Sequence, residues 1–335
     1  MAAGRGSRLS PLSNRIPKPL IHCAGRPIIH HLISALIKSK IEGLVVGLGW
    51  KANSLQQFLS SEIFSLEIQN VIVPDYERGP LKTFVTASSK LGNEPFVVCP
   101  ADLVSVSSNI ENIVRSHLHD EVLLSLAVAP TLEIGTKVYG DENGLITGVG
   151  EGSEGKFLGS SAQIIMADNR FVEFCSDLET RGFNTISEVI NELSARGRKM
   201  RALPVSGYWK DIDTVQALLD ANRHLLCSEL DLPSSCVYVP VGDSMEFGQD
   251  ISLGSEVMIH AGTKILGPSL VMPESTILAD SVVGPNVSLS EGTKIGASSS
   301  IENAIVFGPG TTGIGTSLSN VIIFKNKVIK GDKIE

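Results

Sequence analysis

The chain has 335 residues, of which 42% are hydrophobic and 19% charged, and its formal net charge at pH 7 is −8. This length favours two domains over one, and the hydrophobic content is sufficient for an ordinary buried core. The acidic balance excludes nucleic acid as a main partner, because phosphate backbones require a basic surface.

The cysteines and the apolar stretches bear on the cellular compartment. Five cysteines are scattered without a CxxC pair or a cysteine–histidine cluster, which argues against a zinc site and against a disulfide framework. No apolar stretch reaches the length of a membrane span, and the N-terminus has no secretory apolar region. We therefore expect free thiols, no membrane partner and a cytoplasmic location.

The first predicted element is a loop of glycines, prolines and cations at residues 4–20. Gly4 and Gly6 let the backbone approach a ligand and turn several N–H groups towards one oxyanion. Arg8 and Lys18 add positive charge, and the prolines on either side of Lys18 restrict the backbone that carries it. This chemistry is suited to binding a polyphosphate.

After this loop, short apolar strands alternate with amphipathic helices. Helices are predicted over 27–40, 52–60, 80–91, 109–118, 185–197 and 214–226, the last with Thr214 as its N-cap. Strands are predicted over 44–48, 71–73, 96–99 and 122–128. Such an alternation predicts an α/β domain with a parallel sheet.

From about residue 227 the composition changes. Residues 227–236 read as a linker, and beyond it a large apolar residue recurs at every sixth position. The series is Val241, Phe247, Leu253, Ile259, Ile265, Val271, Ile277, Val283, Leu289, Ile295, Ile301 and Phe307. This period resembles that of hexapeptide-repeat β-helices, in which three hexads close one coil. The resemblance implies a left-handed parallel β-helix of roughly four coils.

One aspartate stands where open α/β sheets bind ligands. Asp102 follows the predicted strand 96–99 by three residues, so it lies just beyond the carboxyl end of that strand. A carboxylate in that position can hold a hard cation.

The loop at 4–20 resembles the signature of the sugar-nucleotide pyrophosphorylases, which is Gly-x-Gly-Thr/Ser-Arg-Leu-x-Pro-Leu-Thr/Ser followed by Pro-Lys-Pro-Leu. Twelve residues match it in order. The resemblance implies that Arg8 and Lys18 are catalytic. The residues that it implies for nucleotide binding are Ala2, Ala3, Gly4, Gly6, Ser7, Gly79 and Pro80.

The same family resemblance supplies a second metal ligand and a sugar ligand. Residues 209–214 resemble the family motif Trp-x-Asp-Ile-Gly-Thr, so Asp211 matches the second metal aspartate, while Asp213 takes the place of the glycine. Asp102 and Asp211 would then bind Mg²⁺. Glu151 is the candidate for the family's sugar-binding glutamate, although no lysine follows it directly.

The resemblance covers nearly the whole chain and gives a complete expectation for the fold. It implies a Rossmann-like, mostly parallel sheet in a nucleotidyltransferase domain at 1–226, the linker at 227–236, and the left-handed β-helix at 237–335. The family's first strand runs into Ala-Ala-Gly, so most of that strand is missing before Gly4. We expect a chain extended upstream by several apolar residues to be more stable.

The expected reaction joins a nucleoside triphosphate to a sugar 1-phosphate and releases pyrophosphate. The domain order and the segment after Cys23 look most like mannose-1-phosphate guanylyltransferases, with glucose-1-phosphate thymidylyltransferases as the alternative. A bifunctional nucleotidyltransferase and acyltransferase is a further alternative, although His260 is the sole histidine beyond residue 224. A regulatory subunit without activity is the last alternative. We also expect homo-oligomers that form through the β-helix.

Overall fold

The structure is a computed structural model that describes residues 1–118, 121–131, 135–228, 238–240, 246–247, 251–308 and 310–331. The chain forms two compact units. Unit 1 consists of Met1–Gly6, Asn14–Leu20 and Ile28–Asp211, and unit 2 consists of Ser7–Ser13, Ile21–Pro27 and Ile212–Glu335.

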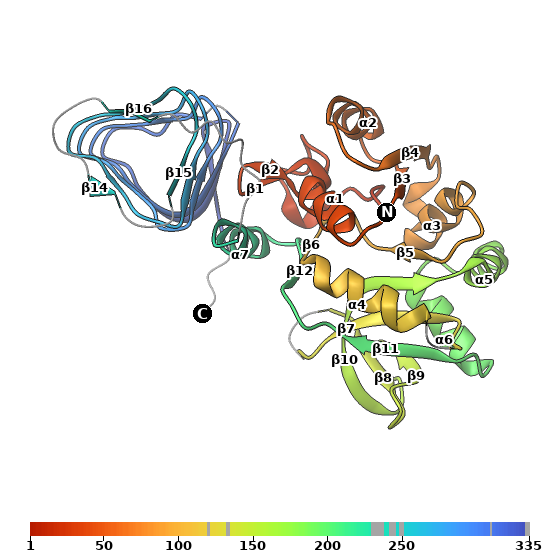
Figure 1. The fold of residues 1–335 in the computed structure, drawn as a ribbon. Coiled ribbons are helices and arrows are strands. Elements are labelled where there is room, and N and C mark those ends of the chain that lie inside the picture. The colour runs from red at the N-terminus through yellow and green to blue at the C-terminus, as the bar shows by residue number, and fades with distance from the viewer. Residues whose placement is uncertain are drawn as a thin grey trace. The chain divides into compact units, whose positions relative to one another are not determined.

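Unit 1 is an α/β domain (Figure 1). Its strands are β3 (Gly43–Leu48), β4 (Glu67–Ile72), β5 (Phe96–Val98), β6 (Leu103–Ser105), β7 (Leu124–Ala129), β8 (Lys137–Gly140), β9 (Ile146–Val149), β10 (Lys156–Ala167), β11 (Met200–Pro204) and β12 (Trp209–Asp211). Its helices are α1 (Ile28–Lys38), α2 (Ala52–Ser61), α3 (Pro80–Ser88), α4 (Ser107–Leu118), α5 (Asn169–Thr180) and α6 (Ile186–Ala195), with 3₁₀ turns η2 (Lys18–Leu20) and η3 (Tyr76–Arg78).

The strands of unit 1 form one six-stranded mixed sheet, in the order β11-β7-β10-β8-β9 with β5 paired to β10, and two separate two-stranded sheets, β3 with β4 and β6 with β12. β3 pairs in parallel with β4, and β7 pairs in parallel with β11. The long strand β10 runs antiparallel to β5, β7 and β8. Residues 1–3 connect β3 with the segment that follows β5. The Ala2 amide donates to the Gly47 carbonyl at 2.9 Å, and the Ala101 amide donates to the Met1 carbonyl at 2.9 Å.

Helices cover both faces of the six-stranded sheet that contains β10. Alternate residues of β10 point to opposite faces, so Ile164 joins the cluster of buried residues that contains Leu32 of α1 and Ile110 of α4. Ile165 joins the other cluster, where Phe171 of α5 packs with side chains of α3 and α6. The expected α/β fold is confirmed, with apolar cores on the two sides of a central sheet.

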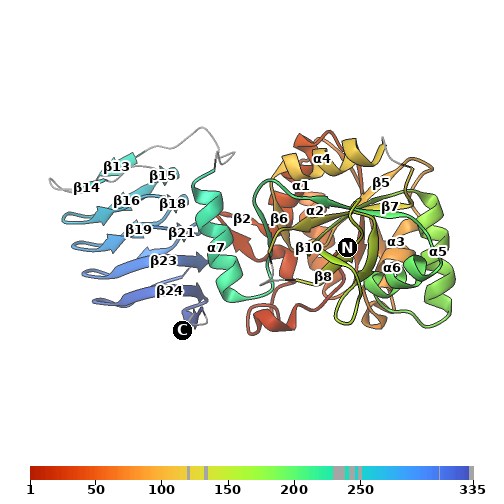
Figure 2. The ribbon, with the colours of Figure 1, turned by 90° about the horizontal axis from the view of Figure 1, so that it is seen from below.

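Unit 2 contains the predicted β-helix. Its strands are β13 (Tyr238–Pro240), β14 (Glu246–Phe247), β15 (Ile251–Leu253), β16 (Val257–Ile259), β17 (Lys264–Ile265), β18 (Ser269–Val271), β19 (Thr276–Ile277), β20 (Val282–Val283), β21 (Val287–Leu289), β22 (Lys294–Ile295), β23 (Ser300–Phe307), β24 (Ser317–Phe324) and β25 (Lys327–Lys330). Figure 1 looks along the coils, which outline a triangle, and Figure 2 shows the coils stacked.

The register of these strands confirms three hexads per coil. Lys264 pairs with Val282, eighteen residues on, and Val282 pairs in turn with Ser300. The apolar sixth positions from Ile259 to Ile301 are 0% exposed. Small residues four places later are buried as well, because they fill the remaining inward positions of each hexad.

Helix α7 (Val215–Leu226) packs within unit 2, on β21, β23 and β24. Its N-cap is Thr214 as predicted, since the Thr214 hydroxyl accepts from the Ala217 amide at 3.1 Å. Asn222 anchors the helix, because its Oδ1 accepts from the Ser288 hydroxyl at 2.7 Å and from the Ala24 amide at 2.9 Å. The short strands β1 (His22–Cys23) and β2 (Arg26–Pro27) and the turn η1 (Ser7–Leu9) also belong to this unit.

Several predictions concern residues beyond the described ranges. Most of the linker at 227–236 lies outside the described residues, as do Val241 and the side chain of Phe247. The described cysteines, which are Cys23, Cys99, Cys175 and Cys227, are free thiols as expected. Among the described helices, none combines the length and the hydropathy needed to cross a membrane.

Candidate functional site

Lys18 opens the turn η2 and is held close to the backbone of the loop at 4–20. Its residue surface is only 8% exposed, which is unusual for a lysine. Gly6 lies against it with a φ of +62°, and a Cβ on Gly6 would stand 3.0 Å from the Lys18 Cβ. Glycine is therefore required at this position both by the backbone conformation and by the close approach.

Two aspartates share the Lys18 ammonium. The Nζ atom lies 2.5 Å from Asp102 Oδ2 and 3.8 Å from Asp211 Oδ1. Asp102 immediately precedes β6, and Asp211 ends β12, which pairs antiparallel with β6 so that Asp211 faces Leu103 (Figure 1). The strand pairing thus places the two carboxylates side by side, although they are 109 positions apart in the chain.

A residue of β10 completes this cluster. Gln163 Nε2 donates to Asp211 Oδ2 at 2.9 Å. Gln163 has a φ of +59° and lies within a register shift of the β10–β7 pairing, which turns its side chain out of the regular alternation. The sequence analysis did not identify Gln163, because a local bulge has no clear signal in a single sequence.

The donor set fits a Mg²⁺ ion. Asp102 and Asp211 already face one common positive charge, and each side chain keeps 22–23% of its surface exposed. Mg²⁺ takes one or two protein carboxylates and completes its shell with water and substrate phosphates. No group of three or more His, Cys, Asp or Glu side chains with metal-binding geometry occurs among the described residues, so a larger protein cage is not formed there.

Arg8 belongs to unit 2, whereas Lys18 belongs to unit 1. Its guanidinium Nη1 is 2.7 Å from Asp213 Oδ2, and the Arg8 side chain is 75% exposed. Asp213 is the residue that departs from the glycine of the family motif. The buried side chains of Leu9 and Leu12 anchor the segment next to Arg8.

The other predicted nucleotide-binding residues fall into two groups. Ala2 and Ala3 are buried, and the Ala3 carbonyl accepts from the Trp50 amide at 2.9 Å. They lie in unit 1 with Gly4 and Gly6, whereas Ser7 belongs to unit 2.

Gly79 and Pro80 lead into α3. Gly79 has a φ of +117°, and a Cβ there would stand 2.6 Å from the Asn184 carbonyl oxygen. Pro80 occupies the first turn of α3. Glu151 is exposed in the turn between β9 and β10, and its role in sugar binding stays a prediction.

A second polar cluster, which the sequence analysis missed, lies at the ends of β3 and β4. Arg5 Nη2 is 2.5 Å from Glu77 Oε1, and the Arg5 guanidinium stacks over the Trp50 ring at 4.7 Å from the centroid. A side-chain hydrogen bond with Tyr76, followed by the charge of Glu77, raises the pKa of Arg5. The position of Trp50 directly after a predicted strand was the signal that could have revealed this cluster.

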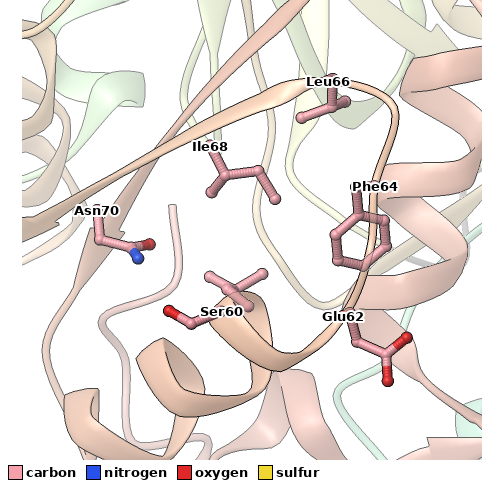
Figure 3. A pocket seen from close by; sticks show the side chains of 7 residues that line it. Ser60, Glu62, Phe64, Leu66, Ile68 and Asn70 are labelled. Atoms are coloured by element: carbon pink, nitrogen blue, oxygen red, sulfur yellow. The ribbon is translucent and has the colours of Figure 1, made fainter.

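A surface hollow of about 230 Å³ lies between the end of α2 and β4 (Figure 3). Its lining residues are Leu59, Ser60, Glu62, Phe64, Leu66, Ile68 and Asn70. None of the predicted site residues lines it.

Comparisons with known proteins show what the chain is similar to. Residues 1–140 match the model of the nucleotidyl transferase family. The whole chain is 23% identical to a probable mannose-1-phosphate guanylyltransferase 3 of Oryza sativa subsp. japonica, covering 92% of that protein. It is 22% identical over its whole length to mannose-1-phosphate guanyltransferase beta-A of Xenopus laevis, again covering 92% of the relative.

Two further matches extend this picture. The bifunctional protein GlmU of Methanococcus aeolicus is 24% identical over 79% of this chain and 60% of its own length. Among solved structures, a UDP-glucose pyrophosphorylase complexed with UDP-glucose has a TM-score of 0.58 and 17% identity, covering 67% of this chain and 95% of that one. The structural likeness supports the same α/β fold.

Proposed function

We propose that this chain, whose resemblance to the sugar-nucleotide pyrophosphorylases these comparisons confirm, transfers a nucleotidyl group from a nucleoside triphosphate to a hexose 1-phosphate. The best candidate is mannose-1-phosphate guanylyl transfer, because relatives that match the whole chain carry that name. The observation that carries the proposal is that the carboxylates of Asp102 and Asp211 both lie within 3.8 Å of the Lys18 ammonium nitrogen.

The reaction needs charge stabilisation more than proton transfer. An oxygen of the sugar phosphate attacks the α-phosphorus, a new P–O bond forms, and the bond to the pyrophosphate oxygen breaks. Because the attacking oxygen is already an anion, no general base is required. The protein must bring two anions together and stabilise the charge that develops on the leaving pyrophosphate.

The residues of the chain divide these tasks. Lys18 neutralises the α-phosphate region, and the backbone N–H groups around Gly4 and Gly6 donate to phosphate oxygens. For Arg8, which belongs to unit 2, a catalytic role stays what the family resemblance implies. Asp102 and Asp211 would hold Mg²⁺, which supplies charge neutralisation on the phosphate oxygens when bound.

A pyrophosphate-release screen tests the proposal. Five nucleoside triphosphates are combined with several hexose 1-phosphates and Mg²⁺, and acetyl-CoA with an amino sugar is added in a separate arm. We expect pyrophosphate release with at least one substrate pair, and the highest rate with GTP and mannose 1-phosphate. Absence of pyrophosphate release with every substrate pair would favour the non-catalytic alternative. Release of the free thiol of coenzyme A from acetyl-CoA would favour a bifunctional enzyme.

The assembly and the compartment are parts of the same proposal. We infer a homo-oligomer formed through the β-helix, because stacked coils end in strand edges that need covering. The free thiols of the described cysteines are suited to a reducing cytoplasm. Sedimentation of the purified protein tests the first of these inferences.

A further inference from the structure

Arg5, Trp50 and Glu77 form a cluster beyond the carboxyl ends of β3 and β4. β3 and β4 are parallel neighbours, and Trp50 and Glu77 follow their carboxyl ends. Open α/β sheets bind ligands at that edge. Arg5 is also the direct neighbour in the chain of Gly6, which packs on Lys18, so the loop that holds Lys18 also supplies the guanidinium of this cluster.

The cluster holds one carboxylate in a fixed position. Glu77 belongs to the turn η3, and Arg5 binds it from a segment 72 residues away. The Trp50 ring supports the guanidinium from one side, and the Tyr76 ring lies against Gly49, where a Cβ would stand 2.5 Å from it. Glu77 is 64% exposed and is therefore open to a ligand.

We propose that Glu77 recognises the base of the nucleotide and selects guanine. A carboxylate has about four acceptor sites, so the bond from Arg5 leaves room for two more N–H donors. Guanine presents two adjacent donors, N1–H and the 2-amino group, to one bidentate acceptor. Adenine, cytosine, uracil and thymine each lack such a pair, because an acceptor stands beside their single donor group.

This inference rests on the proposed nucleotidyl transfer and names the nucleotide that the site takes. Arg5 is a positioning residue in it, since it orients the carboxylate and neutralises part of its charge next to the phosphates. Loss of the carboxylate should therefore change the ranking of bases, whereas a purely structural ion pair would not affect that ranking.

The test compares GTP with ITP, which lacks the 2-amino group. For the wild-type protein we expect kcat/KM with GTP to exceed that with ITP by about tenfold or more, the discrimination typical of a bidentate pair. Glu77→Gln should lower kcat/KM for GTP by a similar factor and bring the GTP-to-ITP ratio below about threefold. Glu94→Gln, which alters an exposed carboxylate elsewhere in unit 1, should leave the ratio unchanged.

Equilibrium binding gives an independent measurement. Titration calorimetry of GTP and ITP with both variants should show the same collapse of preference in Glu77→Gln, and thermal melting checks that the variant is folded. A wild-type protein that turns over another triphosphate better than GTP, or a Glu77→Gln ratio equal to wild type, would overturn the role of Glu77 and leave nucleotidyl transfer intact. Absence of pyrophosphate release with every substrate pair would instead count against nucleotidyl transfer, while calorimetry would still decide on Glu77.

Discussion

Lys18 is the residue whose burial and charge most constrain the candidate site. Its ammonium balances Asp102 and Asp211, so a phosphate that approaches Lys18 enters a region already organised by one cation and two anions. We expect Lys18→Met to lower kcat at least about a hundredfold, because a preorganised donor to the transition state is lost. Lys90→Met, which removes an exposed lysine after α3, is the matched control and should retain activity.

Arg8 and Asp213 offer a test of whether an ion pair serves binding or only folding. The Arg8 side chain is 75% exposed and that of Asp213 31%, so breaking this pair near the surface should change the free energy of unfolding by less than about 1 kcal/mol. Arg8→Ala should reduce turnover at least about a hundredfold if Arg8 binds the β- and γ-phosphates. Asp213→Asn should keep turnover and lower the KM for the triphosphate, because a competing carboxylate is neutralised.

Steady-state kinetics of the two variants separate the possibilities. A loss below about threefold in Arg8→Ala would remove Arg8 from transition-state stabilisation. Equal losses in both variants would mean that the ion pair itself, and not the free guanidinium, is what activity needs.

The family resemblance implied that Asp102 and Asp211 act at one site, and Lys18 was singled out because it stands between two prolines. The strands β6 and β12, whose pairing brings the two aspartates together, were not predicted. Gln163 could not be predicted, because its contact with Asp211 depends on a bulge in β10 that has no periodic pattern in one sequence. The Arg5–Glu77 pair was missed although the position of Trp50 after a predicted strand offered a signal, since that position does not name the partners of the ion pair.

At the scale of single elements, α6 begins with a complete capping box. The Thr185 hydroxyl accepts from the Glu188 amide at 3.1 Å, and Glu188 Oε2 accepts from the Thr185 amide at 2.8 Å. Backbone hydrogen bonds from Asn184 and then Thr185 lower the pKa of Glu188 below its usual value of 4.5. The charged carboxylate is thus favoured in the folded protein more than in the unfolded chain.

This depressed pKa predicts a pH dependence of stability. The contribution of the Glu188 charge is present above the unfolded pKa of 4.5 and is lost as the pH falls through the lower folded value. Glu188→Gln should therefore lower Tm at pH 7, and the difference from wild type should vanish at strongly acidic pH. Melting curves across this range measure it, with Glu173→Gln on α5 as the control; a difference that is constant with pH would contradict the assignment.

Most helices with a regular apolar period were predicted, but α5 at Asn169–Thr180 was missed although its buried residues repeat at helical spacing. The helix predicted over 27–40 is α1 at Ile28–Lys38, because its apolar residues repeat on one face. The strand predicted at 71–73 is β4 at Glu67–Ile72, since polar side chains alternate along this strand and hide its beginning. β10 was missed because Gly159, two serines and the positive φ of Gln163 interrupt its apolar run.

At the scale of the whole molecule, the division into units does not follow composition. The loop at 4–20 reads as one motif, yet Ser7–Ser13 belongs to unit 2 and its flanks belong to unit 1. The family resemblance placed helix α7 in the domain at 1–226, whereas the structure places it in unit 2, where it packs on the β-helix and Asn222 binds Ser288. Such boundaries depend on tertiary contacts, and an amphipathic pattern does not specify which core a helix joins.

The β-helix allows a prediction about how its coils support one another. Ile277 is 0% exposed and pairs in register with Ile259 of one neighbouring coil and Ile295 of the next. Each coil contacts only its neighbours, so a cavity in a central coil weakens two interfaces at once. Ile277→Ala should lower the free energy of unfolding of unit 2 by about 2–5 kcal/mol, the usual cost of truncating a buried isoleucine.

Urea unfolding followed by circular dichroism measures this change, and Thr276→Ala is the matched control. Thr276 precedes Ile277 on the same strand, but its side chain points out of the coil and is partly exposed, so its truncation should cost about 0.5 kcal/mol or less. Because successive residues of a strand alternate in direction, the two neighbours should differ sharply in their effect. Equal effects of the two substitutions would show that the six-residue period does not define the interior of the coil.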